Sequence, residues 1–238
     1  MGRYYRYLEK LGFACRKAGA RPEKIGLVNR MPVYKITLNP AGPVTVAFSA
    51  GIHGDEIAGP WAILDFLKQY DRRDYPGIRI VLFPVASPTA FDKEKRYNYL
   101  DKELNLSFLG KRPPRECRIL QKAMKREKPF FFHALHEDMR SNSFYLFNFE
   151  RKKEKIYRDL VRLAARFMPV NRSRRIIRDR ATNGIIINRE DGSFEHWIYR
   201  RGAPYSMCTE TPGWQPLKKR AALSVTLMNR VLDFSTPR

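Results

Sequence analysis

The chain has 238 residues, of which 43% are hydrophobic and 13% aromatic, so it can bury a sizeable core. This composition excludes an intrinsically disordered chain, and no apolar run approaches the roughly 20 residues that a membrane-spanning helix needs. Lysine and arginine number 46 against 24 acidic residues, which gives a formal net charge of +22.

The positive charge has two interpretations. It indicates either nonspecific anionic partners, such as nucleic acid, anionic lipid or an acidic polymer, or a solvated basic surface. We favour the second, because the basic residues are spread along the chain without a recognised nucleic-acid motif. The three cysteines are widely spaced, which predicts reduced thiols. The N-terminal segment lacks the apolar stretch of a signal peptide, so we expect a cytoplasmic protein.

Hydrophobic periodicity predicts alternating strands and helices. Helices are expected over residues 4–18, 56–70, 114–127, 157–167 and 217–234. Strands are expected over residues 24–28, 33–38, 44–49, 78–85, 129–135, 143–147 and 205–209. This order predicts one α/β domain over residues 1–238, with a mixed, mostly parallel central sheet flanked by helices.

Two histidine motifs follow strands that are predicted to be buried. His53 and Glu56 come directly after the apolar run that starts at Val44, and His133 and His136 follow the run Phe130–Phe132. Zinc accepts histidine nitrogen and glutamate oxygen together, and a catalytic zinc site uses three protein ligands and an open position. Ligands of α/β sheets lie beyond the carboxyl ends of the strands. The pattern therefore indicates a hydrolase that activates water.

Four further motifs occur downstream in a recognisable order. They are S-P-T-A at 87–90, R-Y-N at 96–98, E-L-N-L-S-F at 103–108 and T-E-T-P at 209–212. Together with G-I-H-G-D-E at 51–56 and A-L-H-E at 134–137, they resemble the motifs of the zinc carboxypeptidase superfamily, which includes the succinylglutamate desuccinylases and aspartoacylases. The resemblance covers residues 44–214, and it implies a carboxypeptidase-like fold.

The resemblance also implies roles for individual residues. His53, Glu56 and His136 would bind one zinc ion per chain, and Glu210 would be the general base and acid. Arg96 would bind substrate and stabilise the oxyanion, and Asn105 would help to hold a substrate carboxylate.

Each of these residues also has a structural interpretation. His53 could be a turn residue, Glu56 a carboxylate in the first turn of a helix, Glu210 an exposed strand-end residue and Arg96 a surface arginine. His133 competes with His136 as a ligand, but the two would point to opposite faces of a strand, and the family pattern selects His136. Tyr199 and Tyr205 are not assigned a catalytic role.

The chain departs from the family pattern at three positions. Glu103 stands where the family has aspartate, Ser87 where it has asparagine, and Leu106 where an arginine normally binds the substrate carboxylate. Either another basic residue, such as Lys95 or Arg140, replaces that arginine, or the substrate carries no free terminal carboxylate at this point.

We therefore expect a zinc-dependent hydrolase of amide bonds, of the metallocarboxypeptidase type, acting on a peptide. The alternatives are a deacylase of N-acyl amino acids and an amidase of cell-wall peptides. An alternative from another class is a non-enzymatic basic protein that binds an anionic polymer.

Overall fold

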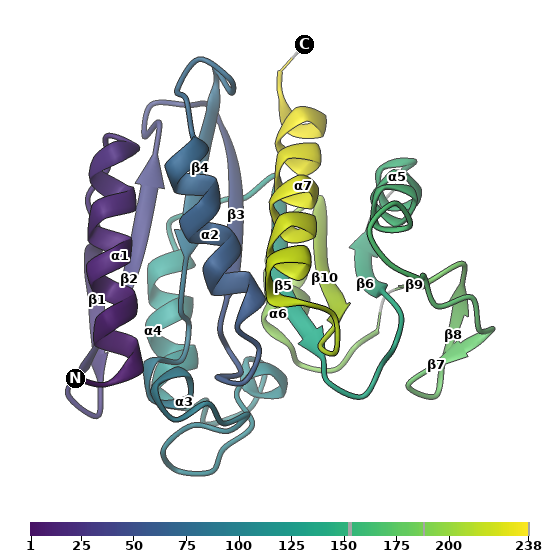
Figure 1. The fold of residues 1–238 in the computed structure, drawn as a ribbon, viewed down its shortest axis with the longest axis horizontal. Helices are drawn as coiled ribbons and strands as arrows, with labels where there is room; N and C mark the ends of the chain where they lie inside the picture. The colour runs from purple at the N-terminus through teal and green to yellow at the C-terminus, as the bar shows by residue number, and fades with distance from the viewer. Residues whose placement is uncertain (152–153, 188, 238) are drawn as a thin grey trace.

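The computed structural model describes residues 1–151, 154–187 and 189–237, and its strands form one mixed sheet flanked by helices (Figure 1). Within these residues the strand order is β1-β2-β4-β3-β5-β10-β6-β9-β8-β7. The strands are β1 (Glu23–Val28), β2 (Met31–Leu38), β3 (Val44–Ala50), β4 (Ile78–Phe83), β5 (Phe131–Asp138), β6 (Tyr145–Glu150), β7 (Arg175–Ile176), β8 (Asp179–Thr182), β9 (Ile185–Ile187) and β10 (Tyr205–Pro212).

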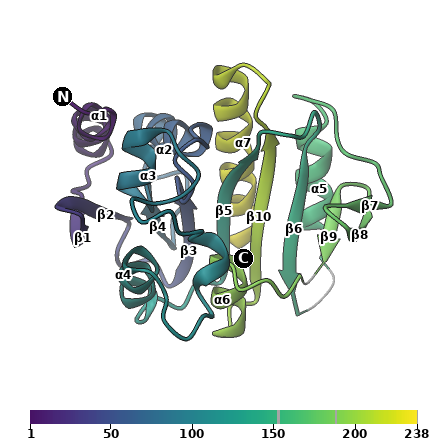
Figure 2. The same cartoon turned by 90° about the horizontal axis from the view of Figure 1, so that it is seen from below.

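Helices cover both faces of the sheet. Figure 2 shows α1, α2 and α7 on one face, and α4 and α6 on the other. The helices are α1 (Arg3–Lys17), α2 (Ala58–Gln69), α3 (Pro88–Lys93), the 3₁₀ helix η1 (Asn105–Ser107), α4 (Arg115–Met124), α5 (Ile156–Ala164), α6 (Phe194–Arg200) and α7 (Leu217–Ser235). In the described part of the chain, none of them has the length and hydrophobicity needed to cross a membrane.

The centre of the sheet is parallel, and both flanks contain antiparallel pairs. β3 runs parallel to β4 and β5, and β5 runs parallel to β10. β2 pairs antiparallel with β4, and β6 with β10. The expected mixed sheet is confirmed, but the expectation that it is mostly parallel is wrong, because five of the nine strand pairings in the described residues are antiparallel and four are parallel. Because the central strands run parallel, the carboxyl ends of β3, β5 and β10 meet at one edge of the sheet, where α/β proteins bind their ligands.

The central strands separate two hydrophobic cores. Phe131 and Met207 are buried in the core beneath α1, α2, α5 and α7. Phe132 and Cys208, the next residues along the same strands, belong to the core beneath α4 and α6. Side chains alternate between the faces of a strand, so the apolar runs at Val46–Phe48 of β3 and Phe131–Phe132 of β5 follow from burial on both sides.

The structure contains elements that the hydrophobic pattern does not predict. β7 and β8 lie in an arginine-rich segment whose side chains are mostly exposed, so the segment lacks the apolar alternation of a half-buried strand. α6 has only seven residues, too few to display a helical period. Conversely, the expected helix over 56–70 begins at Ala58, because Glu56 belongs to the preceding loop.

Candidate metal centre and active site

The loop after β3 carries His53, and two glycines shape it. Gly51 has φ +61°, a left-handed conformation that glycine adopts without strain. Gly54 packs so closely on α3 that a Cβ atom would lie 2.0 Å from the backbone of Ala90. The loop is therefore held against the 87–90 segment, and His53 is buried, with 2% of its surface exposed.

Glu56 lies between two imidazole rings. Its Oε1 is 2.6 Å from His53 Nδ1, and its Oε2 is 2.9 Å from His136 Nδ1. The backbone N–H of Glu137 also donates to Glu56 Oε2 at 3.2 Å, which links the loop to the end of β5. Burial alone would raise the pKa of Glu56, but the two histidines hold it well below its ordinary value.

Glu103 contacts the other side of the His53 ring. Its Oε1 lies 2.8 Å from His53 Nε2, and it also accepts the Asn105 backbone N–H at 3.0 Å. Arg96 donates to both carboxylates, from Nη1 to Glu56 and from Nε to Glu103, each at 3.2 Å. Burial lowers the pKa of His53, but Glu56 and Glu103 outweigh that effect and raise it to about 10.

The side chains of His53, Glu56 and His136 fit a zinc ion. One ligand atom from each lies within 4.8 Å of the others, and two imidazoles with one carboxylate form a zinc donor set. A histidine that binds a metal usually donates its second ring N–H to a carboxylate, and Glu103 is placed to accept from His53. A second group, His136, Cys208 and Glu210, is equally compact. It fits less well, because burial raises the pKa of the Cys208 thiol well above its ordinary value.

Glu210 lies beside this cluster near the end of β10. In the parallel pairing of β10 with β5 it stands opposite His136, and its Oε1 accepts a hydrogen bond from Cys208 Sγ at 3.7 Å. Burial raises the pKa of Glu210 to about 8, although His136 opposes that rise. A carboxyl group that titrates near neutral pH can both accept and release a proton.

Glu137 joins β5 to the helices above the site. One of its oxygens accepts the N–H of Ala58 at the start of α2, at 2.7 Å, and the other is bonded by the Arg220 guanidinium of α7. Glu137 and Arg220 are 3% and 8% exposed. This buried pair holds α2, α7 and the strand end together, and so positions Glu56 relative to His136.

Three residues considered from the sequence lie away from the cluster. His133 points to the opposite face of β5, where its Nε2 lies 2.8 Å from Thr209 Oγ1, and burial lowers its pKa to about 3. The Tyr199 hydroxyl donates to the Glu150 carbonyl, and the Tyr205 hydroxyl donates to Glu154. These contacts tie both tyrosines to the β6–α5 region.

The residues that would recognise a substrate carboxylate are not assembled into a fork. Asn105 is buried, and its side-chain oxygen accepts the backbone N–H of Phe194 at 3.4 Å. Leu106 is 49% exposed. Lys95 and Arg140 are also exposed, in the segments that follow α3 and β5.

Sequence reasoning did not foresee two contacts at the site. Glu103 was noted only as a departure from the family pattern, whereas its carboxylate reaches His53 from 50 positions away. The Tyr145 hydroxyl donates to Asp138 Oδ2 at 2.8 Å, and Tyr145 stands opposite Glu210 in the antiparallel pairing of β6 with β10. The aligned motif position could have indicated Glu103, but no sequence signal distinguishes Tyr145 from the eleven other tyrosines.

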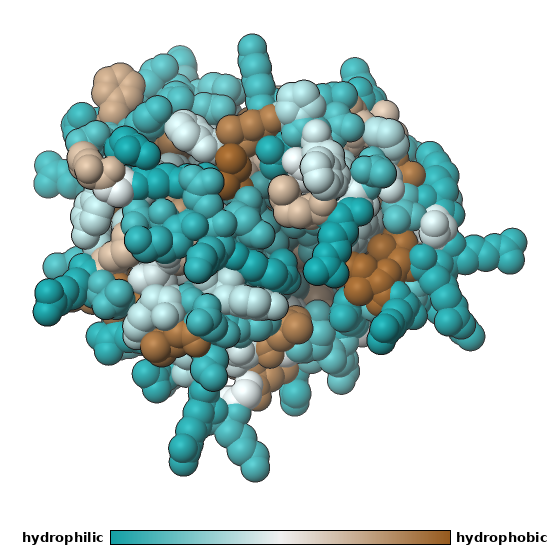
Figure 3. All heavy atoms as spheres, turned by 60° about the horizontal axis from the view of Figure 1, so that its bottom comes forward, coloured by the Kyte–Doolittle hydropathy of each residue, from teal (hydrophilic) through white to brown (hydrophobic). Residues whose placement is uncertain are grey.

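The end of the molecule toward which β5 and β10 run is largely hydrophilic. Figure 3 shows hydrophilic side chains over most of this face, with apolar ones in separate small patches. The exposed apolar residues include Leu106, Met139 and Trp214, which is 73% exposed. The candidate metal cluster lies below this surface, because His53, Glu56 and His136 are each at most 4% exposed.

Comparison with known proteins agrees with this fold. A crystal structure of a Shewanella amazonensis protein, provisionally named a metallopeptidase, superposes with a TM-score of 0.93 at 26% identity, covering 99% of this chain and 94% of that one. A metallo-carboxypeptidase from Burkholderia cenocepacia superposes with a TM-score of 0.75 at 16% identity, covering 96% of this chain and 68% of that one. Bovine thrombin-activatable fibrinolysis inhibitor superposes with a TM-score of 0.70 at 15% identity, covering 99% of this chain and 97% of that one. The last two likenesses concern the fold.

At the level of sequence, no curated protein matches the chain. The model of the succinylglutamate desuccinylase/aspartoacylase catalytic domain matches residues 43–171, which is more than half of the chain. The matched segment contains the loop after β3, the 87–108 motifs and the end of β5. The chain therefore belongs to the succinylglutamate desuccinylase/aspartoacylase catalytic-domain family, within the zinc carboxypeptidase superfamily.

Proposed function

We propose that residues 1–238 form one catalytic domain of a zinc-dependent amide hydrolase, in which His53, Glu56 and His136 bind a single zinc ion. The observation that supports this proposal most strongly is the position of the Glu56 carboxylate between two imidazole nitrogens, at 2.6 and 2.9 Å. When bound, zinc lowers the pKa of a coordinated water and polarises a carbonyl group.

Glu210 is the proposed general base and acid. Its carboxyl group lies within 4.8 Å of a His136 ring nitrogen, where the ionised form can take a proton from the attacking water and the protonated form, which burial favours, can deliver it to the leaving nitrogen. Arg96 has a half-exposed side chain that already spans Glu56 and Glu103. Arg96 therefore brings a fixed cation to the rim of the cluster, where it stabilises the oxyanion that develops during attack. Asn105 is the proposed contact for a polar group of the substrate.

The substrate class has two candidates. A peptide substrate fits the carboxypeptidase-like fold, and the family match favours an N-acyl amino acid. Leu106 stands where an arginine would bind the carboxylate of the substrate, so recognition at this point does not depend on a free terminal carboxylate in either class of substrate. A purely non-enzymatic role, with the basic surface binding an anionic polymer, does not require a half-buried Glu210 beside two histidines and a carboxylate.

A substrate panel with a matched inactive variant tests the proposal. Zinc-loaded protein is assayed on peptides with a free C-terminal acid, on the corresponding amides, on cell-wall peptides and on N-acyl amino acids. Glu210→Gln keeps the size and hydrogen-bonding capacity of the side chain, so it should bind zinc and unfold normally. We expect it to lose hydrolysis by about 10²–10⁴-fold, the usual contribution of a general acid or base. Near-normal turnover in this variant would remove Glu210 from the mechanism.

A further inference from the structure

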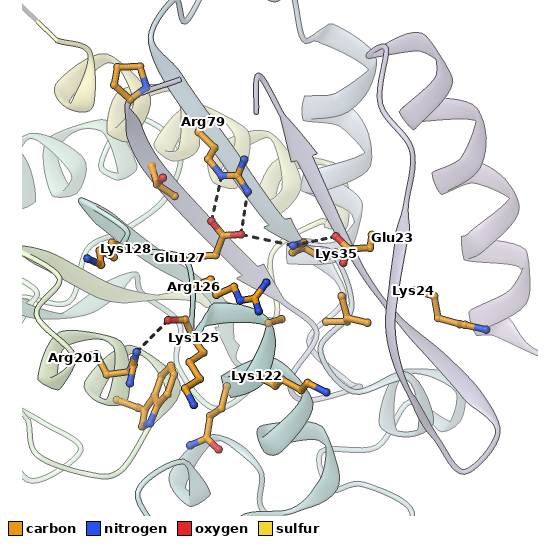
Figure 4. A pocket seen from close by; sticks show the side chains of 16 residues that line it. Glu23, Lys24, Lys35, Arg79, Lys122, Lys125, Arg126, Glu127, Lys128 and Arg201 are labelled. Carbon is orange, nitrogen blue, oxygen red and sulfur yellow. Dashed lines mark hydrogen bonds and ion pairs between the residues drawn. The ribbon is translucent and has the colours of Figure 1, made fainter. Parts of the chain in front are cut away.

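A large basic cleft lies at the end of the sheet opposite the candidate metal centre. It is formed between the first residues of β3 and β4, the β1–β2 hairpin, the segment 121–128 and α6, and has a volume of about 1610 Å³. Typical small-molecule pockets occupy roughly 300–1,000 Å³. Figure 4 shows Lys122, Lys125 and Arg126 extending from α4 and the turn after it, beside a linked row of charged side chains across the strands.

The cleft carries an uncompensated positive charge. Eight lysine and arginine residues line it, against two glutamates. Both glutamates are already neutralised: Glu127 accepts two hydrogen bonds from Arg79, at 3.0 and 3.1 Å, and Glu23 pairs with Lys35 at 3.0 Å. Throughout the described ranges, by contrast, no ion pair involves Lys122, Lys125 or Arg126.

The simpler interpretation is a solvated basic surface. A lysine at the C-terminus of α4 is favoured by the helix dipole, which accounts for Lys122 in its last turn and Lys125 at its C-cap. It does not account for cations that converge on one concavity from several separate segments, among them Lys24 of β1, Lys128 before β5 and Arg201 after α6. Such a cleft concentrates positive potential and attracts an anionic polymer.

We propose that the basic cleft binds single-stranded nucleic acid through its phosphates. A positively charged groove with an aromatic side chain in its wall is the usual arrangement for this ligand. Trp197 lines the cleft, and the Arg201 guanidinium lies 4.9 Å from its ring centroid. A flexible nucleic-acid strand can enter a concave cleft, whereas a flat bilayer surface cannot, so the shape favours the strand as the ligand. The volume of the cleft also exceeds what a single nucleotide would fill.

The cleft and the metal centre lie at opposite ends of the same strands. Thr45 lines the cleft near the start of β3, and β3 ends at Ala50, immediately before the loop of His53. Five residue steps in a strand span about 17 Å. A strand bound in the cleft therefore leaves the metal centre open, and the two activities can be tested separately.

A pair of charge-matched variants tests the location of binding. The cleft variant is Lys122→Gln/Lys125→Gln/Arg126→Gln, and the control is Arg172→Gln/Arg174→Gln/Arg175→Gln, which removes the same charge from the exposed segment around β7. Binding of a fluorescein-labelled 20-nucleotide oligothymidylate is followed by anisotropy between 50 and 200 mM NaCl. We expect the cleft variant to bind the oligonucleotide at least about tenfold more weakly. The slope of log affinity against log salt concentration should become shallower by about 2, because each phosphate contact contributes about 0.7 to this slope and three cations are removed. The control should change affinity less than threefold. Hydrolysis should be unchanged in both variants.

Two outcomes would overturn the proposal. Equal losses in the two variants would mean that the net charge of +22, and not the cleft, attracts the oligonucleotide. Cleft-dependent binding to vesicles of phosphatidylcholine and phosphatidylserine, without binding to the oligonucleotide, would assign the cleft to a membrane surface.

The fluorescence of Trp197 gives an independent readout. The chain has three tryptophans, so Trp61→Phe/Trp214→Phe leaves Trp197 alone. Its emission should change over the same oligonucleotide concentrations as the anisotropy, and an unchanged emission at saturation would place the ligand elsewhere and contradict the proposal.

Discussion

The Nε2 atom of His53 lies 2.8 Å from Oε1 of Glu103, on the side of the ring away from Glu56. The Glu103 carboxylate is held in this position by the Asn105 backbone N–H, which donates to the same oxygen. With a metal bound, the contact between His53 and Glu103 would keep the ring proton on Nε2 and leave Nδ1 to bind the metal.

Removing this contact should weaken metal binding without removing a ligand. We expect Glu103→Ala to lower zinc affinity about 10–100-fold, the usual effect of removing the partner of a metal-binding histidine. Glu103→Asp, which keeps the charge, should lose less. Competition with a chromophoric chelator measures both affinities. Wild-type affinity in Glu103→Ala would show that the carboxylate does not orient His53.

The metal-free protein should respond to pH through the same pair. The pKa of His53 is about 10 in the folded chain against an ordinary 6.5, so its contribution to stability is complete below about 6.5 and is lost as pH rises through 10. The pKa of Glu103 is about 2 against an ordinary 4.5, so its contribution is present above about 4.5 and is lost as pH falls through 2. Together they favour the folded state most between about pH 4.5 and 6.5.

Urea unfolding of chelator-treated protein at pH 6 and pH 9 measures this effect. Wild type should lose more stability over this interval than His53→Ala, which has no proton to release. Because zinc must displace that proton, apparent zinc affinity should rise about tenfold per pH unit from pH 7 to 9. A flat affinity over this range would contradict the raised pKa of His53.

The exposed Leu106 should weaken recognition of a free carboxylate. A charge-assisted bidentate pair contributes about 1.5–3 kcal/mol, so without one we expect the wild type to prefer a free C-terminal acid over its amide by less than about tenfold. Leu106→Arg should increase that preference, and Leu106→Met is the uncharged control. A wild-type preference above about a thousandfold would mean that another cation, such as Lys95 or Arg140, has taken over the role.

Much of the arrangement could be predicted because it depends on strand ends. The apolar runs of β3 and β5 marked buried parallel strands, and parallel strands bring their carboxyl ends to one edge. His53 and His136 were therefore expected to lie together, as they do. Alternation along β5 separated His136 from His133, and the structure has the two rings on opposite faces. The metal-binding roles of these residues remain predictions.

The remaining contacts depend on chain segments without a period. Arg96 and Glu103 lie in the region between α3 and α4, where turns and one short 3₁₀ helix leave no hydrophobic repeat. Similarly, the basic cleft draws its cations from segments that are far apart in sequence. A composition count registers their charge but not that they share one concavity.

The zinc content of three proteins purified without chelator or nickel tests the central claim most directly. Wild type should contain about one zinc per chain, His136→Gln should contain almost none, and His133→Gln should match the wild type, because His133 faces the opposite core. Elemental analysis beside an unfolding curve separates loss of metal from loss of fold. A folded wild type without zinc, or equal zinc in His136→Gln and His133→Gln, would contradict the proposed metal centre.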